Sequence, residues 1–332
     1  MAPDPVEPIS AGRSPVVPKW FSRSLGGGLA LVGGFFVVRA IASQSDVIGQ
    51  VVADANWRWL AAGVVLAGAA MLVIAVLWRS ALRLVGAEMD RRSVVGVYFQ
   101  GELAKYVPGG PWAVVGRAEL GRRRGLTPAA AYGGVALSLA GLYLATALLG
   151  GLLLLAGSNG GPSLVLLPVV AVLVAGLLAL HPRVMTRLIA LSRRILKGDL
   201  EVPRWRDSLV LVLGYLPVPV LIGTATWCLA RALSPHAGYF DVLGATSLAW
   251  LAGFVAVPVP GGVGVREATF VAATFTLPGG VAAVAAVAAR LAFMGVDALG
   301  ALVASVTLRP RSRGGPVSGG DGLPPGSRAM GS

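Results

Sequence analysis

One stretch of the sequence limits the possible folds more than any other feature: between Gly125 and Pro182 no side chain carries a formal charge. This stretch is long enough for two helices that each cross roughly 30 Å of hydrocarbon. Residues 157–162, Gly-Ser-Asn-Gly-Gly-Pro, provide a turn between them. The composition agrees, because 55% of the residues are hydrophobic and only 13% are charged, whereas a soluble domain has about 25% charged residues. The sequence therefore predicts a helical membrane protein.

Four further apolar stretches have the length of a membrane span, namely residues 25–42, 60–78, 208–230 and 280–308. We predict an all-α polytopic protein with about six full spans in one transmembrane domain, residues 25–308. Residues 1–24 and 309–332 are rich in Pro, Gly or Ser and have little to bury, so both are expected to be disordered tails. A signal peptide ending near Ala42 is the alternative for the first stretch, but Arg39 lies inside its apolar part.

The positions of the basic residues predict the orientation. The net charge is +13, and 22 of the 28 Lys and Arg residues lie in the two tails and in residues 79–92, 117–124 and 183–206. They flank apolar stretches instead of forming a basic domain, which is typical of positive-inside topology and not of nucleic-acid binding. We therefore expect a multi-pass protein of the cell membrane with both termini cytoplasmic. Trp57, Trp59 and Trp78 flank the second span and are expected at the membrane interfaces.

Two segments cannot cross the membrane once in this topology. Residues 93–116 begin and end at basic, cytoplasmic segments, and residues 242–277 must begin and end on the opposite side. We predict two re-entrant helical hairpins that enter from opposite sides; the alternative is two ordinary loops and eight shorter spans. Each hairpin is expected to break at a Pro-Gly-Gly motif, because proline removes a helix donor and glycine frees the backbone. The motif residues are Pro108, Gly109 and Gly110, then Pro260, Gly261, Gly262 and Gly264.

Broken helices at membrane depth point to a transport site. Unpaired backbone groups there are tolerated only inside protein or beside an aqueous cavity. A pair of such segments in corresponding halves of a chain is typical of a transporter built from inverted repeats. Both motifs are followed by a basic and an acidic residue: Arg117 and Glu119 in the first, Arg266 and Glu267 in the second. The sequence thus predicts a possible inverted repeat with a polar site between its halves.

Ionisable side chains at membrane depth are candidate site residues, because their burial in hydrocarbon is costly. Glu102 and Lys105 are three residues apart, so they share a helix face and can pair. This pair either holds the first hairpin or meets a lipid headgroup. Arg117 is a further candidate for binding phosphate.

Arg266 and Glu267 follow the second break, where a new helix would present free N–H groups and its positive dipole end. That geometry attracts an anion, and an arginine can hold two phosphate oxygens at once. We predict that Arg266 binds phosphate; the alternative is a structural ion pair with Glu267. Arg290 and Asp297 lie two turns apart on one face of the last span and should point into the bundle. Their alternative role is a structural network with Arg266 or Glu267.

These motifs resemble a known family. Residues 102–110, Glu-Leu-Ala-Lys-Tyr-Val-Pro-Gly-Gly, together with Arg117, residues 124–130 and residues 259–267, Val-Pro-Gly-Gly-Val-Gly-Val-Arg-Glu, are similar to the membrane region of lysylphosphatidylglycerol synthases. The resemblance covers roughly residues 25–308. It implies a lipid flippase, which in that family accompanies a separate soluble aminoacyltransferase domain. We expect no such domain in this chain, so the resemblance implies the stand-alone, flippase-like branch. Residues 111–113, Pro-Trp-Ala, depart from the family pattern, in which many relatives have a further glycine.

Three functions remain open. The first is a flippase or transporter that moves an anionic or isoprenoid-linked lipid between leaflets, without a cofactor and, since no nucleotide-binding Gly-x-x-x-x-Gly-Lys-Ser/Thr motif is present, without ATP. The second is a non-transporting membrane partner of an envelope-synthesis enzyme. The third and weakest is an intramembrane lipid-modifying enzyme, because His181, His236 and the lone Cys228 offer neither metal-binding spacing nor an obvious base. We expect no metal site and no catalysis.

Overall fold

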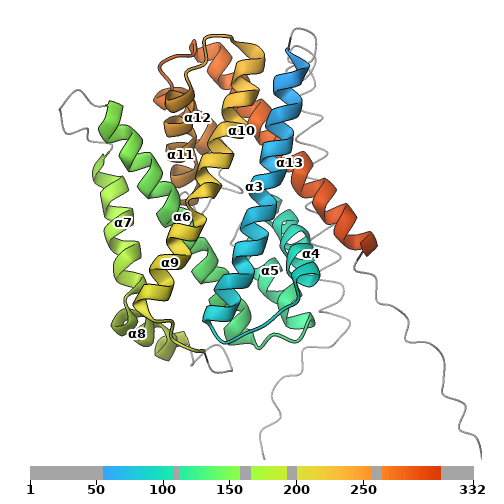
Figure 1. The fold of residues 1–332 in the computed structure, drawn as a ribbon, viewed down its shortest axis with the longest axis vertical. Coiled ribbons are helices and arrows are strands. Elements are labelled where there is room, and N and C mark those ends of the chain that lie inside the picture. The colour runs from blue at the N-terminus through green and yellow to red at the C-terminus, as the bar shows by residue number, and fades with distance from the viewer. Residues whose placement is uncertain (1–54, 108–111, 158–165, 193–199, 256–263, 308–332) are drawn as a thin grey trace, which may run out of the picture.

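The computed structural model describes residues 55–107, 112–157, 166–192, 200–255 and 264–307, and within them it contains helices and no strand (Figure 1). The helices are α3 (Trp57–Leu84), α4 (Arg91–Glu102), the 3₁₀ helix η1 (Leu103–Tyr106), α5 (Trp112–Arg123), α6 (Pro128–Gly157), α7 (Leu166–Leu180), α8 (Pro182–Ser192), α9 (Trp205–Tyr215), α10 (Pro217–Leu233), α11 (Tyr239–Val255), α12 (Val265–Ala273) and α13 (Gly279–Thr307). The all-α polytopic fold is confirmed.

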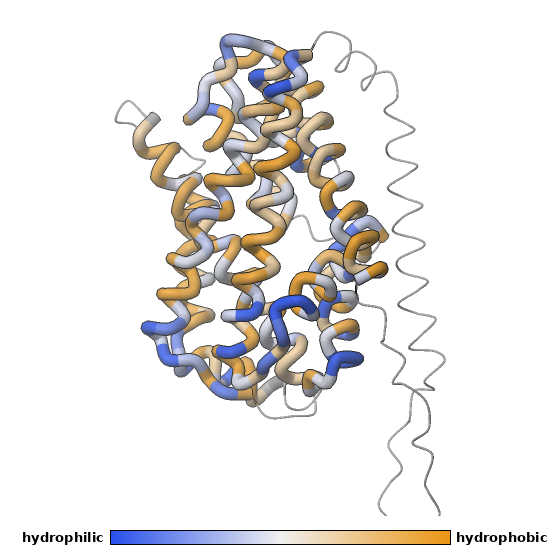
Figure 2. Tube along the Cα trace, turned by 45° about the vertical axis from the view of Figure 1, so that its right-hand side comes forward, coloured by the Kyte–Doolittle hydropathy of each residue, from blue (hydrophilic) through white to orange (hydrophobic). Residues whose placement is uncertain are grey.

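Four helical stretches of the described chain are long and apolar enough to cross a membrane: α3, α6, the stretch Trp205–Leu233 and α13. The bent pair α7 and α8 would make a fifth. The four long stretches confirm the predicted spans at 60–78, 208–230 and 280–308 and the first of the two predicted within 125–182. The second of those two corresponds to α7 and becomes a span only if α7 and α8 are counted together. Figure 2 shows apolar residues along the helices and hydrophilic residues gathered toward the two ends of the bundle. The predicted span at 25–42 and both tails lie outside the described residues.

Glycines bring the spans close together. An added Cβ at Gly63 of α3 would lie 2.7 Å from the side chain of Leu229 in α10, and one at Gly141 of α6 would lie 2.6 Å from Tyr215 in α9. Small residues of this kind allow close backbone approach in membrane bundles. Trp78 is fully buried in the resulting core, so its predicted place at the membrane interface is wrong. Its ring instead faces the α4–α5 hairpin, where the Arg117 guanidinium carbon lies 5.6 Å from the ring centroid.

The first predicted hairpin consists of α4, η1 and α5, which pack against each other in antiparallel fashion. Arg124, just after α5, donates a 2.9 Å hydrogen bond to the Ser93 hydroxyl at the start of α4. Farther along the arms, an added Cβ at Gly101 would lie 2.8 Å from the Cα atom of Arg117. The hairpin is therefore closed at its base and tightly packed between its arms. Residues 108–111, which include Pro108, Gly109 and Gly110, lie outside the described residues.

The second hairpin, α11 and α12, has the same construction. The Asp241 carboxylate at the start of α11 accepts hydrogen bonds from the N–H groups of Phe275 and Thr276, which follow α12. Toward the tip, an added Cβ at Gly253 would lie 2.5 Å from the side chain of Arg266. Helix α12 begins at Val265, as predicted, after Gly264, whose φ of 79° favours glycine. Pro260, Gly261 and Gly262 lie outside the described residues.

The two hairpins open at opposite ends of the bundle (Figure 1). The base of the first adjoins the end of α3, where Arg79 donates a hydrogen bond to the carbonyl of Met89. The base of the second adjoins the start of α3, because the N–H of Asn56 donates to the carbonyl of Ala232, at the end of α10 just before the loop that leads into α11. With 12 residues, α4 is about 18 Å long, shorter than the roughly 30 Å of a bilayer's hydrocarbon core. These lengths and directions fit re-entrant hairpins and not the alternative of eight spans.

One element differs from the sequence prediction. Residues 183–206 were one of the basic segments between apolar stretches and were not predicted to be helical, but α8 (Pro182–Ser192) is a helix that turns by 72° from α7. Pro182 occupies its first position, where a missing N–H costs nothing. Its sequence places Arg183 and Arg187 one turn apart and Leu188 and Ile189 after them. Such an amphipathic helix is suited to lie in the membrane interface. It was not predicted because its basic residues interrupt the apolar stretch by which spans were recognised.

Candidate functional site

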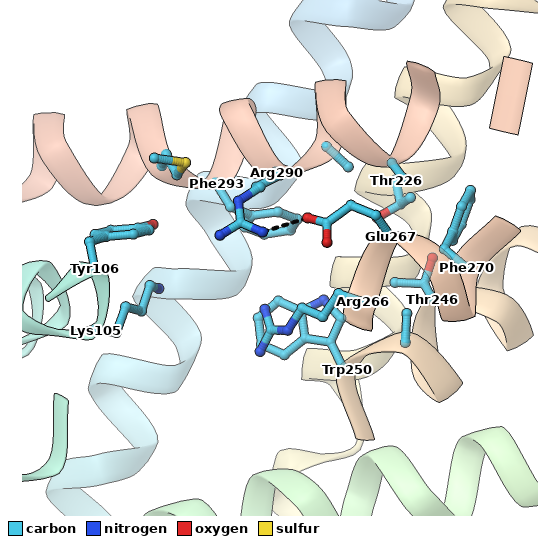
Figure 3. Close-up of a pocket in the computed structure, with 14 residues that line it drawn as sticks. Lys105, Tyr106, Thr226, Thr246, Trp250, Arg266, Glu267, Phe270, Arg290 and Phe293 are labelled. Atoms are coloured by element: carbon cyan, nitrogen blue, oxygen red, sulfur yellow. Dashed lines mark hydrogen bonds and ion pairs between the residues drawn. The ribbon is translucent and has the colours of Figure 1, made fainter. Parts of the chain in front are cut away.

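A cavity lies between the inner ends of the two hairpins and the middle of α13 (Figure 3). Its volume is about 90 Å³, enough for about three water molecules at roughly 30 Å³ each. Two threonines, Thr226 of α10 and Thr246 of α11, also line it. The charged lining residues are Lys105, Arg266, Glu267 and Arg290. Four of the residues predicted from sequence thus converge on one polar space within the bundle.

Glu267 organises the second-hairpin side of this cavity. One carboxylate oxygen accepts a 2.7 Å hydrogen bond from the N–H of Gly264, which caps the start of α12. The other oxygen pairs with Arg290 of α13 at 2.5 Å. Glu267 therefore fixes both the helix start and the position of Arg290, which is the alternative role given to Arg290 from sequence, a structural network with Glu267. Because Glu267 already caps the helix, the dipole end is partly satisfied, and side chains carry most of the cavity's attraction for an anion.

Arg266 is the cation of this cavity that has no carboxylate partner among the described residues. Its guanidinium carbon lies 4.3 Å from the centroid of the Trp250 ring, a cation–π contact. Its Nε is buried without a hydrogen-bond partner in the described part of the chain. The alternative of an Arg266–Glu267 ion pair is not observed, since Glu267 faces Arg290. Gly253 permits this placement, because a Cβ there would lie 2.5 Å from the Arg266 Nε.

A second charged cluster lies behind Lys105. Its ammonium nitrogen is 2.6 Å from Asp297 Oδ2 and 3.0 Å from Glu102 Oε2. The Tyr106 hydroxyl donates a 2.8 Å hydrogen bond to the same Asp297 oxygen. The predicted Glu102–Lys105 pair is confirmed. Asp297 is fully buried, and it belongs to this first-hairpin cluster and not to the predicted network with Arg266 or Glu267.

Arg117 completes the cluster on the side away from the cavity. It forms an ion pair with Glu102 across the arms of the hairpin, and both side chains are buried. Its guanidinium carbon lies 4.7 Å from the centroid of the Tyr98 ring. Arg117, Glu102 and Asp297 are not among the cavity-lining residues. Their geometry is that of a buried network that holds α4, α5 and α13 together.

Formal charges distinguish the two groups. The cluster of Lys105, Arg117, Glu102 and Asp297 is neutral, with two positive and two negative side chains. On the opposite wall, Arg266 and Arg290 face Glu267 alone, which leaves one positive charge in excess. A cavity inside the bundle with one uncompensated cation attracts a single anion.

The aromatic neighbours of these charges were not predicted from the sequence. Tyr106 and Trp250 contact the candidate residues directly, and Tyr98 and Trp78 enclose Arg117. The position of Tyr106, next to Lys105 and just before the first break, could have identified it from the sequence. The contacts of Trp250, Tyr98 and Trp78 depend on how the helices pack. Among the described residues, no three His, Cys, Asp or Glu side chains are grouped closely enough to hold a metal ion.

Comparison with known proteins assigns the fold. The family model described as lysylphosphatidylglycerol synthase TM region matches residues 25–304. The chain belongs to this family. The family and the apolar helices together make it a membrane protein related to lipid handling, and the match includes both hairpins and α13 almost to its end. No curated protein matches the chain as a relative.

Proposed function

We propose that this lysylphosphatidylglycerol synthase TM-region protein moves an anionic, phosphate-containing lipid between the leaflets of the cell membrane by transport and not catalysis. The observation that carries this proposal is Arg266, a cation inside the bundle without a carboxylate partner in the described chain. Arg266 is half-buried, and its buried Nε has no hydrogen-bond partner among the described residues; a charge held inside a membrane bundle in this way is costly unless an anion compensates it. A lipid phosphate supplies that anion and accepts two hydrogen bonds from one guanidinium group.

The hairpins suggest the path. They open at opposite ends of the bundle (Figure 1). The cavity lies between their inner ends. At about 90 Å³ the cavity suits a phosphate group and not a whole lipid headgroup, since ligand pockets usually enclose about 300–1,000 Å³. Movement of one hairpin relative to the other would open the site first to one side and then to the other. The other face of α11 and α12 lines an apolar cleft with α6 and α7, which suits the lipid's hydrocarbon tail.

Charge distribution supports an orientation. The end of the bundle at the base of the first hairpin carries Arg79, Arg83, Arg91 and Arg92 together with the basic residues 122–124. The opposite end carries Arg58 and Arg231. By the positive-inside rule the first hairpin opens to the cytoplasm and the second to the outside.

Lipids that remain bound after purification in detergent test the proposal. Mass spectrometry should find one class of phosphate-containing lipid enriched over the membrane extract. The Arg266→Ala variant should lose this enrichment, and Arg266→Lys should keep only part of it, because lysine cannot form the bidentate contact. Arg58→Ala is the matched control, since Arg58 also lies over a tryptophan, Trp57, but is exposed.

Two outcomes would contradict this function. Enrichment that is unchanged in Arg266→Ala would exclude the cavity as the headgroup site. Bulk lipid without enrichment would favour the second function, a membrane partner of an envelope-synthesis enzyme. That alternative predicts that one enzyme co-purifies with the chain and remains bound when Arg266 and Glu267 are both substituted.

A further inference from the structure

Two buried carboxylates share one ammonium group at the edge of the cavity. Lys105 bridges Asp297 and Glu102, with distances of 2.6 and 3.0 Å. Lys105 also lines the cavity, whereas the two carboxylates lie behind it. Figure 3 shows the Lys105 side chain on the cavity wall opposite Arg266 and Trp250. An anion held by Arg266 therefore competes with the two carboxylates for the same ammonium group.

The two carboxylates differ in what remains when Lys105 leaves. Glu102 keeps its ion pair with Arg117. Asp297 keeps only the hydrogen bond from the Tyr106 hydroxyl, and its Oδ1 is buried without a hydrogen-bond partner in the described chain. Asp297 is thus the group left without a compensating charge.

Among the residues that the structure describes, none around Asp297 offers a replacement cation. Facing it are Glu102 and Tyr98 of α4 and Lys105 and Tyr106 of η1. On α12, Glu267 faces α13 two turns away and is paired with Arg290. The helices α3 and α10 also pack on α13, but their charged residues lie near the helix ends.

We propose that Asp297 is a coupling-proton site: binding of an anionic lipid phosphate in the cavity draws Lys105 away, and Asp297 then takes up one proton from water. This inference rests on the proposed function. It gives the transporter an energy source, a proton that moves with the lipid.

The step balances in atoms and charge. The Lys105 ammonium group keeps its protons and exchanges a carboxylate partner for a phosphate oxygen. The Asp297 carboxylate becomes a carboxylic acid, whose added proton removes the buried negative charge, and no covalent bond within the lipid forms or breaks. An isolated buried carboxylate favours its neutral form, which drives the uptake. Because the lipid carries one negative charge and the proton one positive charge, their joint movement is electrically neutral.

Proton uptake during lipid binding tests the inference. Dihexanoylphosphatidylglycerol is the probe, because its phosphodiester does not titrate near neutral pH, so any proton taken up belongs to the protein. Calorimetric titration of the detergent-purified full chain in buffers of different ionisation enthalpy counts the protons. We expect about one proton per bound lipid, and an affinity that rises about tenfold for each unit by which the pH falls.

Two variants separate the proton site from general effects. Asp297→Asn should bind the probe with no proton uptake and no pH dependence. Glu119→Gln, which alters a partly exposed carboxylate paired with Arg122, should behave as the wild type. The wild-type proton count decides the question even if Asp297→Asn does not fold. Binding without proton uptake would overturn the coupling and leave the proposed function intact; absence of binding would overturn the proposed function and the coupling with it.

Discussion

The close contact between the arms of the first hairpin predicts the effect of a single methyl group. In Gly101→Ala the new Cβ would lie 2.8 Å from the Arg117 Cα and 2.9 Å from its backbone nitrogen. Ordinary contacts begin near 3.4 Å, so the two backbones must separate by about 0.6 Å. Overpacking of this kind costs about 1–3 kcal/mol. A helical alanine recovers about 1 kcal/mol relative to glycine.

Gly68→Ala in α3 isolates the packing term. An added Cβ at Gly68 meets no atom within 4 Å, so this variant should gain only the preference of a helix for alanine over glycine. Both variants share this gain, so the difference between their free energies of unfolding reports the packing cost alone. We therefore expect Gly101→Ala to be less stable than Gly68→Ala by about 1–3 kcal/mol. Equilibrium unfolding by titration with sodium dodecyl sulfate in mixed micelles measures both values.

The matching position of the second hairpin should respond differently. In Gly253→Ala the Cβ would meet the Cγ and Nε atoms of Arg266, which belong to a flexible side chain. The side chain can turn away from Trp250 at the cost of a cation–π contact of about 0.5–2 kcal/mol, so stability should stay near that of wild type. Loss of a positioned charged hydrogen bond, worth about 1.5–3 kcal/mol, should weaken binding of a phosphodiester lipid about 10- to 150-fold.

Two results would refute this reasoning. If Gly101→Ala were as stable as Gly68→Ala, the arms of the first hairpin would not be in contact. If Gly253→Ala bound the phosphodiester as tightly as wild type, the position of Arg266 over Trp250 would have no role in recognition.

Three further substitutions test the surrounding framework. Glu102→Gln leaves a buried arginine unpaired and should cost about 3–5 kcal/mol, whereas Glu119→Gln at the surface should change unfolding free energy by no more than about 0.5 kcal/mol. Asp241→Ala removes the acceptor that closes the base of the second hairpin. We expect faster hydrogen exchange at the amides of Phe275 and Thr276, just after α12. Unchanged exchange at these amides would contradict that role. Asp90 caps α4, and hydrogen bonds from the side chain and the backbone of Ser93 lower the pKa of the Asp90 carboxyl. The ionised cap therefore stabilises the folded state at pH values above the unfolded-state pKa of Asp90. This contribution is lost as the pH falls through the lowered pKa of the folded state. Asp90→Ala should cost about 0.5–2 kcal/mol, and Asp90→Asn should keep the cap but lose the pH dependence of stability.

Much of the fold could be predicted because a bilayer constrains sequence strongly. The spans follow from apolar length, and the two hairpins follow from the side on which the flanking basic residues must lie. The start of α12 at Val265 follows from the Pro-Gly-Gly break. The Glu102–Lys105 pair follows from residue spacing alone, because both residues belong to consecutive turns of one segment.

Contacts between distant segments could not be predicted in the same way. Asp297 lies nearly 200 residues after Lys105, and their pairing depends on how α13 packs against the first hairpin. Spacing within α13 suggested that Asp297 and Arg290 act together, but the helix presents each to a different hairpin. Trp78 has the composition of an interfacial residue at a span end, yet the buried Arg117 draws its ring into the core.

Lipid movement itself is the most direct test of the central claim. Fluorescent phosphatidylglycerol in proteoliposomes, with dithionite added outside to bleach the outer leaflet, reports exchange between leaflets. In vesicles with wild type or Arg58→Ala, dithionite should bleach nearly all the label. Vesicles with Arg266→Ala should keep the protected inner-leaflet fluorescence that protein-free vesicles show. Equal exchange in Arg266→Ala and wild type, or a wild type that matches protein-free vesicles, would contradict the account.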